Sequence, residues 1–184
     1  MKNLKELLKI ARQTLEEYVK TGRIPRIEVQ NEALRQPHGA FVTLRKNDKL
    51  RGCIGILESN QPLWQVIQQQ TIAAAAQDPR FPPVSESELK DIKIEISVLS
   101  PLQKVNSWKE IELGKHGVVI EQGSRRGVFL PQVAKETGWD LKTFLGQLCF
   151  QKAGLPWNAY QNPQTNIYIF STKTASESDS SQSY

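Results

Sequence analysis

The residues best suited to do chemistry lie within one six-residue segment, LRGCIG, at positions 50–55. Cys53 supplies a thiol, and the adjacent Gly52 lacks a side chain and permits an unusual backbone bend, so the thiol could be presented to a ligand. Gly55 would let a ligand approach the main chain closely. Residues two apart on a strand share a face, so Arg51 is expected beside Cys53, where it could lower the pKa of the thiol or bind an anion.

The same segment also has a purely structural interpretation. A small cysteine next to a glycine is typical of a kinked, buried strand. A free thiol, with a pKa of about 8.5, is only a few per cent ionised at neutral pH, so a nucleophilic Cys53 would need help of the kind that Arg51 offers. The residues alone leave both interpretations open.

A general base for Cys53 would have to come from elsewhere in the chain. His116 lies in a predicted turn and is the better of the two histidines for that role. Glu95 falls on the polar face of a predicted strand and could orient the imidazole. The alternatives are a solvated turn histidine and a surface carboxylate that pairs with Lys93. The sequence thus predicts a catalytic set of Cys53, His116 and Glu95, but it does not show that they are close in space.

A second anion-binding candidate is Arg80, in the segment DPRFPP at positions 78–83. The prolines make this segment a stiff, extended loop, which reduces the entropy cost of presenting a guanidinium group to a carboxylate or phosphate. The alternative is an internal ion pair with Asp78 that fixes the loop. The predicted ligand-binding residues are therefore Arg51, Gly52, Gly55, Asp78 and Arg80.

Cysteine and histidine usage excludes several classes of site. The chain has two cysteines, far apart in sequence, and two histidines, which excludes a disulfide framework, a cysteine-rich zinc site and an HExxH motif. No phosphate-binding P-loop and no dinucleotide fingerprint occurs. Cys149 lies in an apolar helical segment and is interpreted as a core thiol. We therefore expect no metal and no cofactor.

The charge distribution favours an anionic partner. The formal net charge is +5, and the surplus lies in residues 1–60. A mild basic excess suits an anionic ligand, nucleic acid included, and is also compatible with a protein partner. Residues 45–51 carry four cationic side chains, but no aromatic residues are interleaved with them, which favours a solvated turn over an RNA-contacting patch.

Nothing in the sequence predicts a membrane association. The longest aliphatic run, residues 72–76, is far shorter than the roughly 20 residues that cross a bilayer. The first twenty residues carry glutamates where a secretory signal would be apolar. A soluble, cytoplasmic protein is expected.

Hydrophobic periodicity and turn residues predict the elements that must position these side chains. A helix is expected over the first twenty residues, ending at Thr21-Gly22, and a hairpin over residues 39–56. The further expectations are helices over 62–77 and 141–153, short helices after Ser85 and Ser107 and near 132–136, and strands at 92–98, 118–120, 128–130 and 166–170. Recurrent hairpins indicate an α+β fold with antiparallel β-sheets flanked by helices. A disordered polar tail is expected over residues 172–184.

The LRGCIG segment closely resembles the signature hexapeptide of the AMMECR-type domain family. Further segments match that family in order, at residues 39–44, 78–83, 95–99, 114–117, 130–134 and 152–155, so the resemblance covers roughly residues 1–171. It implies a stand-alone, single-domain member with two interleaved lobes and the hexapeptide lining a cleft. The family is biochemically unassigned, so the resemblance supplies no activity.

Three functions are compatible with these residues. The first is an enzyme whose cleft, centred on Cys53, acts by thiol chemistry on an anionic substrate such as a nucleotide or RNA. The second is a non-catalytic module that binds nucleic acid or a protein through the same cleft. The third makes Gly52 and Cys53 a folding device only. The expectation from sequence leans to the first.

Overall fold

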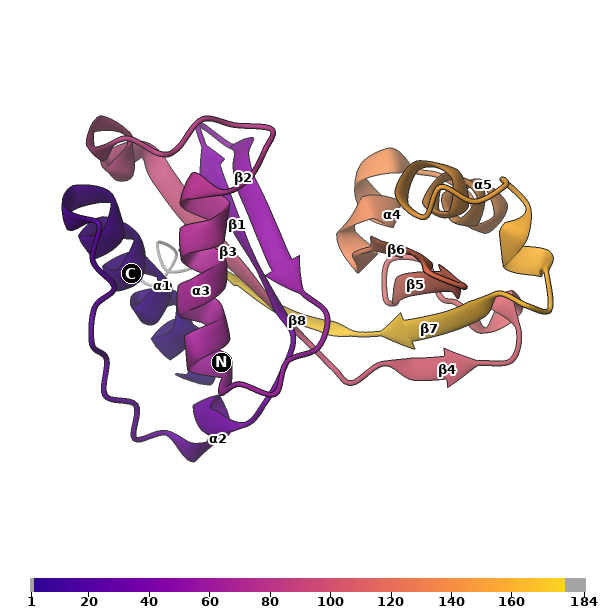
Figure 1. Cartoon of the computed structure of the whole chain (residues 1–184), viewed down its shortest axis with the longest axis horizontal. Coiled ribbons are helices and arrows are strands. Elements are labelled where there is room, and N and C mark those ends of the chain that lie inside the picture. Colours follow the sequence, from indigo (N-terminus) through magenta and orange to yellow (C-terminus); the bar gives the residue numbers. More distant parts are fainter. Residues whose placement is uncertain (1, 178–184) are drawn as a thin grey trace, which may run out of the picture. The chain divides into compact units, whose positions relative to one another are not determined.

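The computed structural model describes residues 2–177, which divide into two compact units. Among the described residues, one unit comprises residues 2–99 and 173–177, and the other comprises Ser100–Thr172. Each unit has a four-stranded sheet with helices, as Figure 1 shows. The predicted α+β class with antiparallel sheets is confirmed.

The first unit packs helices against one face of its sheet, whose strand order is β2-β1-β3-β8. Its elements are α1 (Lys2–Thr21), α2 (Glu32–Arg35), β1 (Ala40–Lys46), β2 (Lys49–Ile56), α3 (Leu63–Ala76), the 3₁₀ helix η1 (Glu86–Asp91), β3 (Ile92–Leu99) and β8 (Thr172–Ser176). Ala40, Val42 and Leu44 of β1 are fully buried in one core with residues of α1 and α3. The alternate β1 residues, Phe41 and Thr43, therefore face the opposite side of the sheet.

The β1–β2 hairpin carries a bulge at Arg51. Asn47 and Asp48 form the turn with positive φ values of 51° and 61°, as a two-residue hairpin turn requires. Arg45 pairs with Leu50, but Leu44 pairs with Gly52, so Arg51 is the extra residue. The bulge interrupts the strict alternation that would have placed Arg51 beside Cys53.

The second unit has the sheet order β4-β7-β5-β6. Its elements are β4 (Gln103–Val105), η2 (Trp108–Glu110), β5 (Gly117–Gln122), β6 (Arg125–Phe129), α4 (Pro131–Thr137), α5 (Leu141–Gln147), the π-helix η3 (Leu148–Lys152), η4 (Ala159–Gln161) and β7 (Asn166–Phe170). Phe144, Leu145, Leu148 and Cys149 are fully buried in its core, so the interpretation of Cys149 as a core thiol is confirmed.

The structure corrects several boundaries. The helix expected over 141–153 changes after Gln147 into a π-helix, in which Ala153 N–H donates to Leu148 C=O. Residues 172–176 were expected in a disordered tail but form β8, at one edge of the first sheet. The rest of the predicted tail, residues 178–184, lies outside the described residues. The α2 helix and β4 were not predicted, and the helix expected over 62–77 begins at Leu63, with Pro62 in the N-cap position.

An ion pair anchors the end of β8. Glu177 accepts a hydrogen bond from Arg12 Nε at 2.8 Å and another from the Ile94 N–H at 2.8 Å. The Arg12 Nη2 group also donates to the Ile92 carbonyl at 2.7 Å. These contacts hold the end of β8 in place. Because this segment is polar and has no hydrophobic pattern, its composition wrongly predicted a disordered tail.

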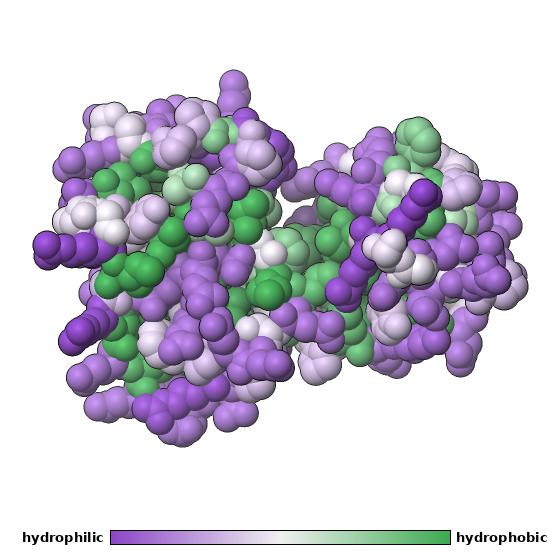
Figure 2. Space-filling view, viewed as in Figure 1, coloured by the Kyte–Doolittle hydropathy of each residue, from purple (hydrophilic) through white to green (hydrophobic). Residues whose placement is uncertain are grey.

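The surface is mostly hydrophilic on the face seen in Figure 2, with apolar residues exposed in patches. No helix among residues 2–177 is long and apolar enough to cross a membrane.

Candidate functional site

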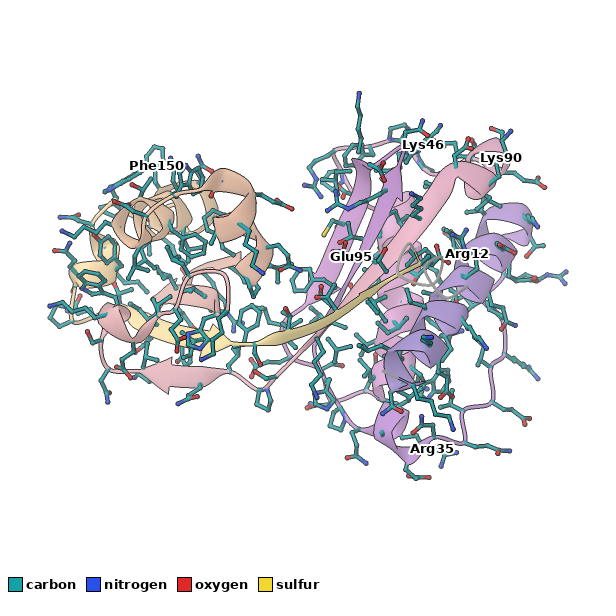
Figure 3. The ribbon with its side chains drawn as sticks, turned by 180° about the vertical axis from the view of Figure 1, so that it is seen from behind. Arg12, Arg35, Lys46, Lys90, Glu95 and Phe150 are labelled. Atoms are coloured by element: carbon teal, nitrogen blue, oxygen red, sulfur yellow. The ribbon has the colours of Figure 1, made fainter. Side chains whose placement is uncertain are left out.

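Cys53, Thr43 and Glu95 form a row across the first sheet, on the face opposite the buried residues of β1. Thr43 of β1 pairs with Cys53 of β2 on one side and with Glu95 of β3 on the other. The Thr43 Oγ1 hydroxyl donates a hydrogen bond to Cys53 Sγ at 3.2 Å. Glu95 lies 3.8 Å from Arg45 Nε and projects from the sheet on the side away from α1 (Figure 3). The structure thus brings together two of the three predicted catalytic residues, with Thr43 between them.

The backbone of Cys53 is capped by Asp78 and Arg80. β2 is an edge strand, so polar backbone groups along its outer side have no neighbouring strand. The Cys53 N–H donates to Asp78 Oδ2 at 2.9 Å, and the Cys53 carbonyl accepts from Arg80 Nη2 at 3.3 Å. A carboxylate and a guanidinium group therefore take the place of a strand at this point.

Asp78 and Arg80 are joined by a two-pronged ion pair. Arg80 Nε and Nη2 donate to the two carboxylate oxygens of Asp78 at 2.9 and 2.7 Å. The Asp78 side chain is 2% exposed, whereas that of Arg80 is 53% exposed. The Arg80 hydrogen bonds, with those from the backbone N–H groups of Cys53 and Arg80, hold the pKa of Asp78 well below its usual range. The structure therefore contains the internal ion pair between Asp78 and Arg80 that the sequence offered as an alternative to ligand binding.

The thiol of Cys53 is not activated in this environment. Burial raises its pKa above the usual value, and the nearby carboxylates of Asp78 and Glu95 act in the same direction. The Thr43 hydroxyl and the charge of Arg80 favour the thiolate but do not outweigh burial. Burial thus disfavours the thiolate form of Cys53.

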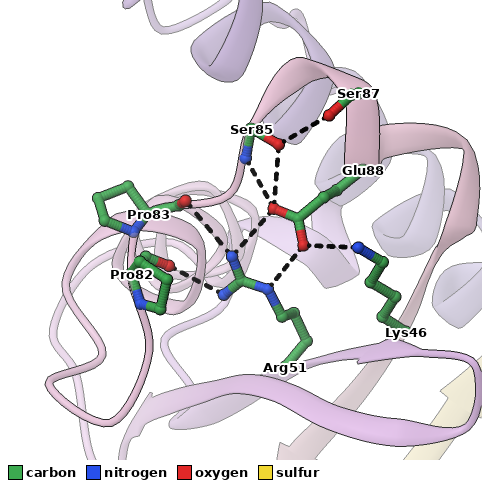
Figure 4. A network of polar contacts seen from close by, with 7 residues as sticks. All are labelled: Lys46, Arg51, Pro82, Pro83, Ser85, Ser87 and Glu88. Carbon is green, nitrogen blue, oxygen red and sulfur yellow. Dashed lines mark hydrogen bonds and ion pairs between the residues drawn. The ribbon is translucent and has the colours of Figure 1, made fainter.

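Arg51 is committed to contacts within its own unit (Figure 4). Its Nε and Nη2 groups each donate to a carboxylate oxygen of Glu88 at 3.0 Å, and Nη1 donates to the Pro82 carbonyl at 2.9 Å. Glu88 also accepts from Lys46 Nζ at 3.0 Å and caps η1 through the Ser85 N–H. The bonds from Arg51 and Ser85 lower the pKa of Glu88 far below its usual range. Arg51 thus fastens the proline-rich loop to β2.

The two glycines of the hexapeptide are packed against the protein's own atoms. A Cβ added to Gly52 would collide with the Ala74 carbonyl oxygen of α3, and one added to Gly55 would collide with the Phe41 ring. Gly52 therefore allows β2 and α3 to approach closely, and Gly55 makes room for a cross-strand aromatic ring. Neither glycine needs a ligand to explain it.

His116 belongs to the second unit. Its Nδ1 accepts a hydrogen bond from the Glu112 N–H at 3.1 Å, and its backbone N–H donates to the Glu112 carbonyl at 2.9 Å. These bonds make it part of the turn before β5. Its predicted role as the base for Cys53 stays a prediction.

Among residues 2–177, no group of three or more His, Cys, Asp or Glu side chains is placed to hold a metal ion.

Comparison with known proteins identifies the family. The AMMECR1 family profile matches residues 8–175. The chain belongs to the AMMECR1 family. Among its relatives, Protein MK0488 of Methanopyrus kandleri is 41% identical over 182 residues, covering 94% of this chain and 87% of the relative. Protein NEQ441 of Nanoarchaeum equitans is 42% identical over 172 residues, covering 89% of this chain and 94% of the relative.

A solved structure supports the fold of this AMMECR1-family chain. The crystal structure of the uncharacterized protein PH0010 from Pyrococcus horikoshii superposes with a TM-score of 0.89 at 34% sequence identity, covering 95% of this chain and 91% of that one. The family resemblance expected from the hexapeptide and the segments that follow it is confirmed.

Proposed function

We propose that this AMMECR1-family protein is a binding module for an anionic ligand, which docks on Arg80 beside the Cys53 thiol. The observation that carries the proposal is the state of the Arg80 guanidinium. One of its edges is fixed by the buried carboxylate of Asp78, while the side chain remains half exposed. Within residues 2–177, its Nη1 group has no hydrogen-bond acceptor. A preorganised guanidinium edge of this kind suits a carboxylate or phosphate group.

The surrounding loop supports the same proposal. Arg51 holds the Pro82 and Pro83 carbonyls, at 2.9 and 3.3 Å. Phe81 is close to both arginines, its ring centre 5.9 Å from the Arg51 guanidinium carbon and 5.5 Å from that of Arg80. Because the loop is already rigid, little conformational entropy is lost when an anion binds.

Thiol chemistry is the second candidate function, favoured by the Thr43 hydroxyl on Cys53 Sγ and by Glu95 in the same row. In that function Cys53 would be the nucleophile, His116 the acid and base, and Glu95 the positioning residue. The raised pKa of the thiol argues for binding over catalysis in the ligand-free protein.

Arg80→Lys tests the binding function. Lysine keeps the positive charge next to Asp78 but has no second amino group to face a ligand. In an NMR titration with inorganic phosphate, we expect the wild-type protein to show chemical-shift changes at the amides of Cys53 and Arg80. The affinity should fall at least about fivefold in Arg80→Lys, as expected for losing one charge-assisted hydrogen bond.

Arg23→Lys is the matched control, since Arg23 is exposed in the same unit, and it should bind like the wild type. Cys53→Ser separates the two candidate functions: unchanged phosphate affinity is expected for a binding module, and loss of the response would favour a role for the thiol. Shifts that are absent from residues 53 and 80, or equal in Arg80→Lys and wild type, would refute the proposed anion site.

A further inference from the structure

A stripe of exposed side chains on the second unit is unrelated to the Cys53 site. Phe150, in the π-helix η3, is 65% exposed, and Trp157 is 44% exposed. Figure 3 shows Phe150 at the outer surface of its unit. The buried side of the same helical segment carries Phe144, Leu145, Leu148 and Cys149. Phe150 lies on its exposed side, where an amphipathic helix normally has a polar residue.

The Trp157 ring lies over the same helical segment that carries Phe150. An added Cβ at Gly146 would fall within the Trp157 indole, so that ring lies directly over Gly146. Lys142 precedes Gly146 by four residues in α5, so the two share one face of that helix, and Phe150 follows in the π-helix η3 that continues it. The stripe therefore runs from Lys142 through the Trp157 ring to Phe150.

The flanks of this stripe are basic. Lys142 and Lys152 are exposed, and residues 141–172 contain no aspartate or glutamate; the carboxylate of Asp140, which caps α5, lies close enough to Lys142 for their charges to interact. Exposed Arg125 of β6 lies beside the end of η3, where its Nη1 group donates to the Gly154 carbonyl at 2.7 Å. Gly127 of β6 packs tightly against the backbone of Ala153, which holds β6 and η3 together.

We propose that the stripe of Lys142, Trp157 and Phe150, flanked by Lys152 and Arg125, binds single-stranded nucleic acid. Exposed aromatic rings next to cationic side chains are what single strands need, because bases stack on the rings while the cations contact phosphates. A stretch without carboxylates suits a polyanion and disfavours a basic partner. The interleaving of aromatic and cationic residues that is missing from the β1–β2 turn is present here.

Phe150→Ala is the direct test, because Phe150 is exposed and its removal leaves the core intact. The probe is a fluorescein-labelled 15-nucleotide oligouridylate, followed by fluorescence anisotropy at low and moderate salt. Stacking of one base is worth about 1–3 kcal/mol, so Phe150→Ala should weaken binding at least about fivefold. Phe150→Trp should retain the affinity. Lys142→Gln should weaken binding and reduce its salt dependence.

Ile24→Ala is the control for loss of an exposed apolar side chain, since Ile24 is 59% exposed in the first unit, and it should bind like the wild type. Three results would overturn the proposal: no binding of the oligonucleotide at low salt, equal affinity of Phe150→Ala and wild type, or equal binding of a duplex of the same length. Self-association that Phe150→Ala abolishes, measured by sedimentation, would assign the stripe to a second copy of the chain instead.

Discussion

Replacing Asp78 by asparagine is expected to lower the free energy of unfolding by about 3 kcal/mol, because it breaks a buried ion pair by removing one partner. Asp78 accepts hydrogen bonds from the Cys53 N–H and from Arg80 Nε and Nη2. An asparagine keeps the shape, but its amide nitrogen cannot accept those bonds and it carries no charge. We expect a loss at the lower end of the range for a broken buried ion pair, because the Arg80 side chain is half exposed and water can solvate its charge.

Thermal unfolding followed by circular dichroism measures this effect. For a chain of this size, about 3 kcal/mol corresponds to a fall in Tm of about 6–12 °C. Asp48→Asn is the matched control: the Asp48 side chain is 87% exposed and 3.4 Å from Lys93, and its replacement should change stability by less than about 0.5 kcal/mol. A similar small change in Asp78→Asn would show that the ion pair contributes little to the fold.

Acidification should distinguish the wild-type protein from Asp78→Asn. The pKa of Asp78 is lower in the folded protein than its ordinary value of 3.8, so its contribution to stability is complete above that value and is lost as the pH falls below it. Wild type should therefore lose stability below about pH 4 more steeply than Asp78→Asn. Glu88, whose pKa is also strongly lowered, remains in both and gives both a residual slope.

Gly52→Ala is expected to be the second most damaging substitution, costing about 3 kcal/mol, at the upper end for overpacking. The new methyl group would collide with the Ala74 carbonyl oxygen, a backbone atom that no side-chain rotation can move. Either β2 or α3 must shift, and a shift of β2 would break the Cys53 N–H bond to Asp78. Chemical denaturation of the variant measures the loss.

Gly22→Ala serves as the comparison for Gly52→Ala. Nothing lies within 4 Å of a Cβ at Gly22, but its φ of +72° is strained for alanine, so a cost of about 1 kcal/mol is expected. If Gly52→Ala costs no more than Gly22→Ala, the close packing of β2 on α3 is not what requires a glycine at position 52.

The sequence predicted most elements because their signals are local. The alternation of Ile92, Ile94 and Ile96 and the capping boxes at Ser85 and Ser107 depend only on near neighbours, and the structure contains all of them. β8 could not be predicted in this way, because Glu177, which directly follows it, is held by Arg12 and Ile94, more than 80 residues away.

The candidate site depended on one feature that spacing does not reveal. A two-residue turn at Asn47 and Asp48 would by itself place Thr43 opposite Gly52. The bulge at Arg51 shifts the register by one residue and places Thr43 opposite Cys53. The same bulge separates Arg51 from Cys53, so the arginine near the thiol is Arg80, which reaches the Cys53 carbonyl. Thr43 was missed because its contact with the thiol exists only in the shifted register.

The central claim, that Cys53 is a protonated thiol in a recognition site, is tested most directly by its rate of alkylation as a function of pH. Peptide mass spectrometry can follow iodoacetamide modification of Cys53, with fully buried Cys149 as an unreactive control in the same chain. The account predicts slow modification, with an apparent pKa above that of a free thiol, because burial raises the pKa of this thiol. Fast modification with an apparent pKa below about 8 would contradict it and restore Cys53 as a nucleophile.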